Sequence, residues 1–293
     1  MNLGFNMKGS YTLRLLRKGR VVAERSFDNI ITNGGLDRLM SVVGSALTTC
    51  YVGTGTSAPA VGNTTLATPL ASTSGGTGAT TANAGTAPYK NTYTRLFEFP
   101  LGAVVGNVTE IGVGWGSGLF SRALVLDGGG SPTALTVTAA DILQVTYKIE
   151  QTPGVTSTTG SFLLNGSSLG YTARIINVTQ NAFSYMATNG YMNPSFWAGV
   201  YETGTLAAIT DAAPTGAGAG MNSSTNAAYT SGTYERSATI SVALANGNFA
   251  GGIGSMVVVV GNGWTYHIVF ASPIMKTASQ TLSLGVKYSI SQG

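Results

Sequence analysis

The sequence predicts an all-β fold of two tandem, duplicated β-sandwich-like domains, each with one short helix and a long loop rich in glycine, threonine and alanine. Three observations lead to this prediction. Many short segments of β-branched and alternating apolar residues are separated by turns rich in glycine and proline. The regular alternation of helices and strands that a parallel α/β sheet requires is missing from the pattern. Several short segments of the first half also recur, in the same order, in the second half.

The first half begins with a predicted β-hairpin, residues 11–17 and 20–31 around a Lys18-Gly19 turn. A short helix to about residue 43 should follow, because Asn33 can cap its start and the next apolar residues have helical spacing. Further strands are predicted at residues 50–53, 92–99, 108–115, 119–126 and 142–150. Residues 54–90 are small and lack periodicity, which predicts a long loop, and residues 203–231 predict its equivalent in the second half.

Two pairs of tyrosines indicate the duplication most clearly. Tyr93 and Tyr234 lie in similar segments, as do Tyr147 and Tyr288, and the members of both pairs are 141 positions apart. Three further echoes lie upstream, at residues 11–14 and 171–174, 32–34 and 188–190, and 54–56 and 203–205. We therefore expect one β-sandwich at residues 1–152 and a diverged copy at 153–293, with Tyr93 superposed on Tyr234 and Tyr147 on Tyr288.

The chain carries little charge for its hydrophobicity. Charged residues make up 9% of its 293 residues, against about 25% in an ordinary soluble domain, whereas 43% are hydrophobic and the mean hydropathy is +0.21. No apolar run is long enough for a membrane span, and the N-terminal segment lacks the apolar core of a signal peptide. We expect no membrane insertion, and we interpret the low charge as typical of a subunit that packs among others.

The net charge of +4 lies entirely in residues 1–40, which hold seven basic and three acidic side chains. The predicted hairpin tip brings Arg17, Lys18 and Arg20 together, and these three are the candidate assembly contact with an acidic surface. The alternative is a solvated turn without a partner. No basic stripe interleaved with aromatic residues continues past Arg38, so the sequence predicts no nucleic-acid binding.

Residues suited to catalysis or metal binding are scarce. The single histidine, His267, and the single cysteine, Cys50, both lie in predicted strands. They are too few for most metal sites, the carboxylates are scattered, and the glycines at 112–118 lack the spacing of a phosphate-binding loop. We expect no catalytic residue, no metal and no cofactor, and hence no enzyme.

Aromatic residues gather in the second half between residues 183 and 201. Tyr191, Phe196, Trp197 and Tyr201 are a candidate aromatic binding surface, because aromatic rings on an uncharged surface can stack on sugars or anchor a protein interface. The alternative is that they are ordinary strand and core residues.

Blocks of the first half resemble, in order, those of tail proteins of tailed bacteriophages. The blocks are FDNIITNGGLDRL at residues 27–39, CYVGTGT at 50–56 with Pro59, TEIGVGW at 109–115, LFSRAL at 119–124 and ILQVTY at 142–147. The resemblance covers about residues 5–152, and the second half lacks the 109–115 and 119–124 blocks. It implies a non-enzymatic structural component of the virion, in the tail tip, baseplate or tail-fibre attachment region.

This resemblance sets further expectations. The protein would be made in the cytoplasm of the bacterial host, reside in the virion tail, and assemble as a homo-oligomer with other tail proteins. The first domain would serve attachment and assembly, and the second would be peripheral or face the receptor. One alternative is a receptor-binding module for a host glycan or pilus, and another is a capsid decoration protein.

Overall fold

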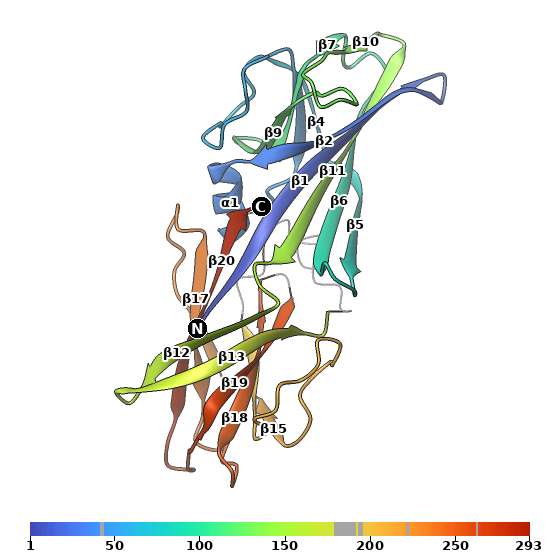
Figure 1. Ribbon diagram of the computed structural model, residues 1–293. Coiled ribbons are helices and arrows are strands. Elements are labelled where there is room, and N and C mark those ends of the chain that lie inside the picture. Colours follow the sequence, from blue (N-terminus) through green and yellow to red (C-terminus); the bar gives the residue numbers. More distant parts are fainter. Residues whose placement is uncertain (42–43, 179–191, 193–195, 221–222, 262) are drawn as a thin grey trace.

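The computed structural model describes residues 1–41, 44–178, 192, 196–220, 223–261 and 263–293 (Figure 1). Within these residues the chain is nearly all β, which confirms the predicted fold class, and α1 (Asn33–Met40) is the one helix. The molecule is elongated, with one lobe from each half of the chain (Figure 1).

Eleven strands of the described residues belong to the first half. They are β1 (Asn2–Arg17), β2 (Arg20–Ile31), β3 (Thr49–Gly53), β4 (Pro69–Ser74), β5 (Thr77–Ala84), β6 (Lys90–Phe99), β7 (Gly106–Val108), β8 (Glu110–Trp115), β9 (Gly118–Leu124), β10 (Leu135–Val137) and β11 (Asp141–Pro153). The predicted loop at 54–90 also contains β4 and β5, which alternation could not reveal because their residues are small and polar. The helix is capped by Thr32 rather than by Asn33.

Nine strands belong to the second half. They are β12 (Ser157–Leu164), β13 (Ser167–Ile176), β14 (Trp197–Tyr201), β15 (Gly218–Gly220), β16 (Ser223–Asn226), β17 (Glu235–Val242), β18 (Ile253–Val260), β19 (Trp264–Ile274) and β20 (Leu282–Gln292). The segment predicted as a loop at 203–231 contains β15 and β16, in the places that β4 and β5 take in the first half. The helix expected near residues 188–190 lies outside the described residues.

The strand pairings of the two halves correspond one to one, with a single gap. In the first half β2 pairs with β9, β9 with β8, β8 with β3 and β3 with β4; in the second half β13, β19, β18, β14 and β15 pair in the same succession. Likewise β11–β6–β5 corresponds to β20–β17–β16, and the β1–β2 hairpin corresponds to β12–β13. Both hairpins turn on two residues with positive φ, Lys18-Gly19 and Asn165-Gly166. Apart from the short β7–β10 pair, only the β1–β11 pairing has no described counterpart.

The offset of 141 positions also holds in the pairing register. Tyr147 of β11 lies opposite Arg95 of β6, and Tyr288 of β20 lies opposite Arg236 of β17. These residues thus occupy equivalent places in one large sheet that both halves share. Tyr93 of β6 lies opposite Ile149, whereas Tyr234 lies just before β17, where its carbonyl accepts the Ile290 N–H at 3.0 Å.

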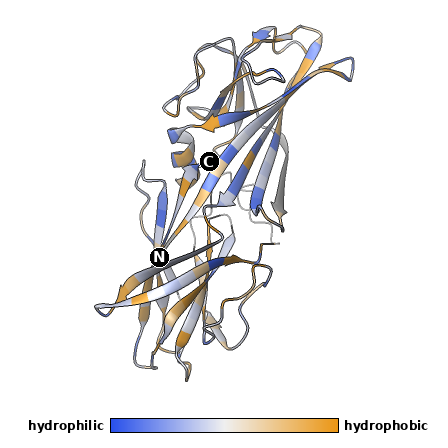
Figure 2. Ribbon diagram, in the orientation of Figure 1, coloured by the Kyte–Doolittle hydropathy of each residue, from blue (hydrophilic) through white to orange (hydrophobic). Residues whose placement is uncertain are grey.

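Strand β1 joins the two lobes. It pairs antiparallel with β2 and β11, and its first residues, Asn2–Met7, pair parallel with Lys287–Gln292 of β20. The buried Phe5 ring lies 6.3 Å from the ring of Trp264 and 5.9 Å from that of Tyr288, both in the second half. The apolar residues of both halves therefore form one continuous core, whose alternation with polar residues along the strands is visible in Figure 2.

Helix α1 also bridges the halves. Its Asp37 carboxylate accepts hydrogen bonds from the Tyr229 hydroxyl (2.5 Å) and the Gly232 N–H (2.7 Å). Arg236 of β17 donates from Nε to the carbonyl of Met40, the last residue of α1, at 2.7 Å. Because the last carbonyls of a helix lack partners within the helix, Arg236 supplies the cap that the helix itself cannot.

Candidate functional site

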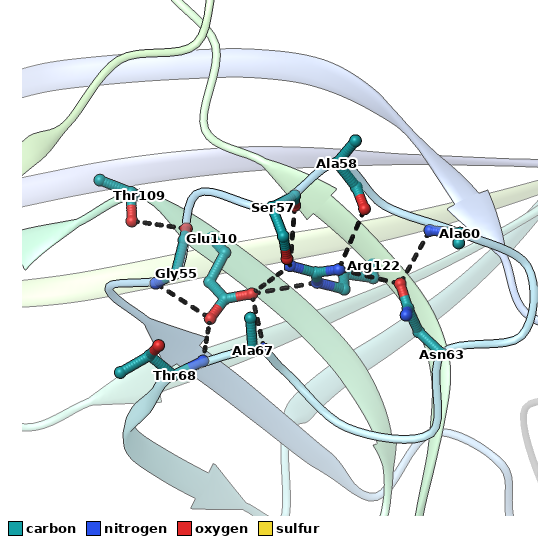
Figure 3. Close-up of polar contacts among 10 residues, drawn as sticks. All are labelled: Gly55, Ser57, Ala58, Ala60, Asn63, Ala67, Thr68, Thr109, Glu110 and Arg122. Carbon is teal, nitrogen blue, oxygen red and sulfur yellow. Dashed lines mark hydrogen bonds and ion pairs between the residues drawn. The ribbon is translucent and has the colours of Figure 1, made fainter.

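A buried ion pair joins β8 and β9. Ile111 and Val113 of β8 point into the core, so Glu110, which alternates with them, lies on the other face of the sheet with Arg122 of β9. The Arg122 guanidinium donates from Nη2 (2.8 Å) and Nε (3.0 Å) to Oε2 of Glu110 (Figure 3). The two side chains are 2% and 0% exposed, which is rare for charged residues unless they are paired.

The Glu110 carboxylate also accepts three backbone N–H groups from the loop above it. Its Oε1 accepts from Gly55 (3.1 Å) and Thr68 (2.7 Å), and its Oε2 accepts from Ala67 (3.0 Å). Burial acts to raise the pKa of Glu110, but these N–H groups and Arg122 outweigh it, so the pKa lies below its ordinary value. Glu110 is therefore ionised at neutral pH, and its carboxylate holds both ends of residues 54–68, which we call the pinned loop.

Arg122 fastens the middle of the same loop. It donates to the Ser57 carbonyl (2.9 Å), to the Ser57 hydroxyl (3.0 Å) and to Oδ1 of Asn63 (2.9 Å). The loop is also tied to the start of α1, because the Asn33 N–H donates to the Val61 carbonyl at 2.8 Å. Figure 3 shows the pinned loop wrapped around the ion pair.

The start of α1 docks directly on β9. The Thr32 hydroxyl accepts the Gly35 N–H at 2.9 Å and donates to the Leu119 carbonyl, while the Thr32 N–H donates to the Phe120 carbonyl at 2.8 Å. A Cβ atom at Gly35 would lie 2.3 Å from the Phe120 carbonyl oxygen, so only glycine allows this close approach. The sequence blocks at 27–39, 50–56, 109–115 and 119–124 therefore meet at one place, around Glu110 and Arg122.

The polar contacts of this cluster hold the pinned loop in place. Both charged groups are buried and have hydrogen-bond partners within the chain, so neither is poised to take or give a proton to a bound molecule. Among the described residues, no group of three or more His, Cys, Asp and Glu residues could hold a metal ion. In the same part of the chain, none of the helical structure is long and apolar enough to cross a membrane.

The second half fastens its equivalent loop with different residues. Arg174 of β13 donates to the carbonyls of Leu206 (3.1 Å) and Ala207, and Nδ1 of His267 accepts the Ala207 N–H at 3.0 Å. Residues 206 and 207 follow Thr-Gly-Thr as residues 57 and 58 do in the first half. Burial, together with the charge of Arg174, lowers the pKa of His267 to about 4, so the ring is neutral at pH 7.

Cys50 lies in the core of the first half. It is fully buried in β3 opposite Val113 of β8, and burial raises the pKa of its thiol. A protonated, buried thiol is a poor nucleophile and packs as a small apolar group.

The three candidate assembly cations differ in their contacts. Arg17 donates from Nε (2.8 Å) and Nη2 (3.0 Å) to the two carboxylate oxygens of Asp141, whose side chain is 0% exposed. Lys18 and Arg20 are exposed at the hairpin tip. The tip therefore presents two cations to a partner, while Arg17 is held within the chain.

The candidate aromatic residues do not share one surface. Tyr191 lies outside the described residues, and Phe196 is buried with its ring 5.5 Å from that of Tyr288. Trp197 is 58% exposed on β14, and Tyr201 is half-buried on the same strand, with its ring against Gly218. Trp197 is thus the exposed ring of the set within the described residues.

A cavity of about 430 Å³ lies beside the pinned loop. Its polar lining includes the hydroxyls of Thr64, Thr65, Ser72 and Ser117, its apolar lining includes Leu66, Pro69, Leu70, Ala71 and Leu119, and Tyr51 adds a ring. The Tyr51 hydroxyl donates to the Trp115 carbonyl at 3.0 Å, which fixes that ring. No charged residue lines the cavity, and sequence reasoning gave no sign of it, because its residues come from three separate segments.

Compared with known proteins, the chain matches no protein-family model, and no curated protein or solved structure is significantly similar to it.

Proposed function

We propose that the protein is a non-enzymatic structural component of a bacteriophage virion, from the tail tip, baseplate or tail-fibre attachment region. It assembles as a homo-oligomer and contacts other tail proteins. The observation that carries this proposal is the absence of charged residues from the edge strands of the two large sheets.

The edge strands of the two large sheets are β4, β5, β12, β15 and β16. None of the five contains Asp, Glu, Lys or Arg, although β4 begins with Pro69. An exposed edge offers unpaired N–H and C=O groups to any other strand, and soluble monomers usually protect such edges with lysine, proline or a covering element. Uncharged edges are therefore suited to a subunit whose edges are covered by its neighbours.

Two further features support a structural role. The conspicuous buried polar groups, Glu110, Arg122 and His267, are all used to fasten loops. Four of the five blocks that resemble phage tail proteins also lie together around Glu110 and Arg122, so most of the resemblance falls on one structural unit.

A receptor-binding role is the second candidate, and the cavity beside the pinned loop favours it. Its volume lies within the range of about 300–1,000 Å³ that is typical of small-molecule sites. Uncharged hydroxyls beside the fixed ring of Tyr51 suit a neutral sugar. A glycan site of this kind would lie in the first half, whereas the sequence suggested the second.

Localisation in the particle tests the structural role. Phage particles purified from the host that makes this chain would be analysed by immunoblot and by cryo-electron microscopy. We expect density for the chain in the tail, in a few to a few dozen copies. Hundreds of copies on the capsid would indicate a decoration protein, and absence of the chain from the particles would contradict a virion role. A glycan array probed with the intact protein and with Tyr51→Ala tests the receptor-binding candidate.

A further inference from the structure

One strand pairing of the first half is missing in the second. In the first half, β1 and β11 pair antiparallel over thirteen residue pairs, from Phe5 opposite Pro153 to Arg17 opposite Asp141. Their counterparts β12 and β20 share no residue pair. Apart from the short β7–β10 pair, the remaining pairings of the first half have described counterparts in the second, so this seam is the main difference between them.

Both strands have an unpaired edge along this seam. Within the described residues, β12 pairs with β13 alone. On the edge away from β17, β20 pairs with β1 only from Lys287 onward. The last bond of that ladder is the one from the Met1 amino group to the Gly285 carbonyl, at 3.0 Å. On that edge, the stretch from Leu282 to Val286 therefore pairs with no described strand, whereas its other edge pairs with β17.

The surface is hollowed at both ends of the seam. One hollow, of about 700 Å³, is lined by Ser161 of β12 and by Gly285 and Val286 of β20, among others. The other, of about 670 Å³, is lined by Leu164 of β12 and by Ser283 of β20, among others. Residues of β12 and β20 thus line a shared hollow at each end of the seam, whereas in the first half β1 and β11 pair directly with each other.

The side chains along the seam specify what fits it. Leu282, Leu284 and Val286 face the core, which calls for an apolar residue at alternate positions of an added strand. On β12, Leu163 is 76% exposed, and a strand alongside would give it a cross-strand neighbour. Both described cations at this edge are engaged within the chain: Lys287 is paired with Glu235 at 2.8 Å, and the Met1 amino group donates to the Gly285 carbonyl, so neither calls for a charged segment.

We propose that an edge strand from a second copy of this chain enters the seam between β12 and β20 and completes the second sandwich. The proposal rests on the homo-oligomer of the proposed function and identifies where its copies join. A second copy is the fitting occupant because β1 already shows that a strand of the first half can complete the β20 edge. The edge strands of the chain are also uncharged, as the seam requires. Main-chain hydrogen bonds supply the affinity of such strand addition, and alternate side chains supply its specificity.

Hydrogen exchange on the full-length protein tests this directly. Exchange of the amides in residues 157–164 and 282–286 is followed by mass spectrometry over a hundredfold range of protein concentration, with the oligomeric state measured by sedimentation velocity. We expect these amides to exchange at least about tenfold more slowly once oligomers form, because pairing must open before exchange. Amides of the fully paired β11 should not change.

A charged edge supplies the matched variant. Ser161→Lys with Leu163→Lys places two exposed cations on β12 beside Lys287, which should prevent strand entry while leaving the monomer folded. Gln144→Lys is the control, since it adds a cation to the solvent face of β11, a strand that is already paired on both edges. We expect the double variant to remain monomeric and the control to form oligomers.

The outcomes separate the seam from the wider proposal. Oligomers whose seam amides stay unprotected, or that persist in the β12 double variant, would overturn the seam and leave the homo-oligomer intact. A protein that stays monomeric over the whole concentration range would overturn the second copy as occupant, whether or not the chain is found in virions.

Discussion

Arg122 and His267 occupy equivalent places in the two halves of the molecule. Arg122 lies opposite Gly112 in the β8–β9 ladder, and His267 lies opposite Val257 in the β18–β19 ladder. Each reaches the loop that follows a Thr-Gly-Thr segment. Arg122 does so as a cation paired with Glu110, whereas His267 does so as a neutral ring. One scaffold therefore fixes the same loop in two chemically different ways, and the two loops should respond differently to mutation and to pH.

Removing the charge of Glu110 should be costly. Glu110→Gln leaves the Arg122 guanidinium buried without a counter-charge, and breaking a buried ion pair in this way costs about 3–5 kcal/mol of the free energy of unfolding. The measurement is urea denaturation followed by tryptophan fluorescence, with the loop opening monitored by proteolysis.

Two control variants test whether the loss comes from leaving a buried charge unpaired. Glu110→Leu combined with Arg122→Met should recover only part of the loss, because neither charge is then left unpaired but the N–H groups of Gly55, Ala67 and Thr68 lose their acceptor. Lys287→Met breaks an exposed pair, whose side chains are 40% and 38% exposed, and should cost no more than about 1 kcal/mol. If Glu110→Gln cost no more than Lys287→Met, the pinned loop would not depend on the pair.

The second-half loop should loosen in mild acid. The pKa of His267 is about 4 in the folded chain, against about 6.5 for an ordinary histidine in the unfolded chain. Between these pH values the unfolded chain binds a proton that the folded chain does not. The free energy of unfolding should therefore decrease as the pH falls from about 6.5 toward 4, by on the order of 2 kcal/mol from this group.

Denaturation midpoints measured at several pH values check this expectation. His267→Asn keeps an acceptor near the position of Nδ1, so it should preserve the bond from the Ala207 N–H and remove this part of the pH dependence. Equal pH dependence in the variant and the original chain would assign the effect to carboxylates instead.

The fold class and the repeat were predictable from the sequence because strands and turns leave local signals. The Lys18-Gly19 turn and the 141-residue offset between Tyr147 and Tyr288 both correspond to features of the pairing. Strands β4, β5, β15 and β16 were not predictable, because they consist of small and polar residues that do not alternate with apolar ones.

The fastening residues could not be identified by type or spacing. Glu110 and Arg122 both lie in sequence blocks of the first half, but nothing in the sequence indicates that they pair. Twelve positions separate them, and the pairing depends on the β8–β9 register. The sequence predicts His267 to lie in a strand, but its bond to Ala207 joins residues sixty positions apart. Arg17 was taken as a free cation because Asp141, which binds it, lies at the far end of the domain in sequence.

Arg236 should hold the two halves together through α1. Arg236→Met removes the donor to the Met40 carbonyl and should lower the free energy of unfolding by about 1.5–3 kcal/mol, the range for a hydrogen bond to a charged group. Arg95→Met is the matched control: Arg95 is the counterpart of Arg236, and its buried Nε has no partner. Hydrogen exchange of residues 33–40 should accelerate in Arg236→Met and stay unchanged in Arg95→Met.

The cations of the hairpin tip should differ in what they support. Arg17→Glu sets two carboxylates against each other at the buried Asp141, so it should lower the thermal midpoint of unfolding. Lys18→Glu combined with Arg20→Glu changes exposed side chains alone and should leave that midpoint unchanged.

This separation allows the assembly role of the tip to be tested without unfolding it. If the tip docks on an acidic surface of the virion, Lys18→Glu with Arg20→Glu should lower the occupancy of the subunit in purified particles, and the loss should be smaller for particles assembled at higher salt. Occupancy is measured by quantitative mass spectrometry of the particles, and circular dichroism of the free variant confirms that it is folded. Lys18→Gln with Arg20→Gln removes charge without reversing it and should give an intermediate loss. Full occupancy of the double glutamate variant would show that the tip is a solvated turn, and the docking surface would then have to lie elsewhere.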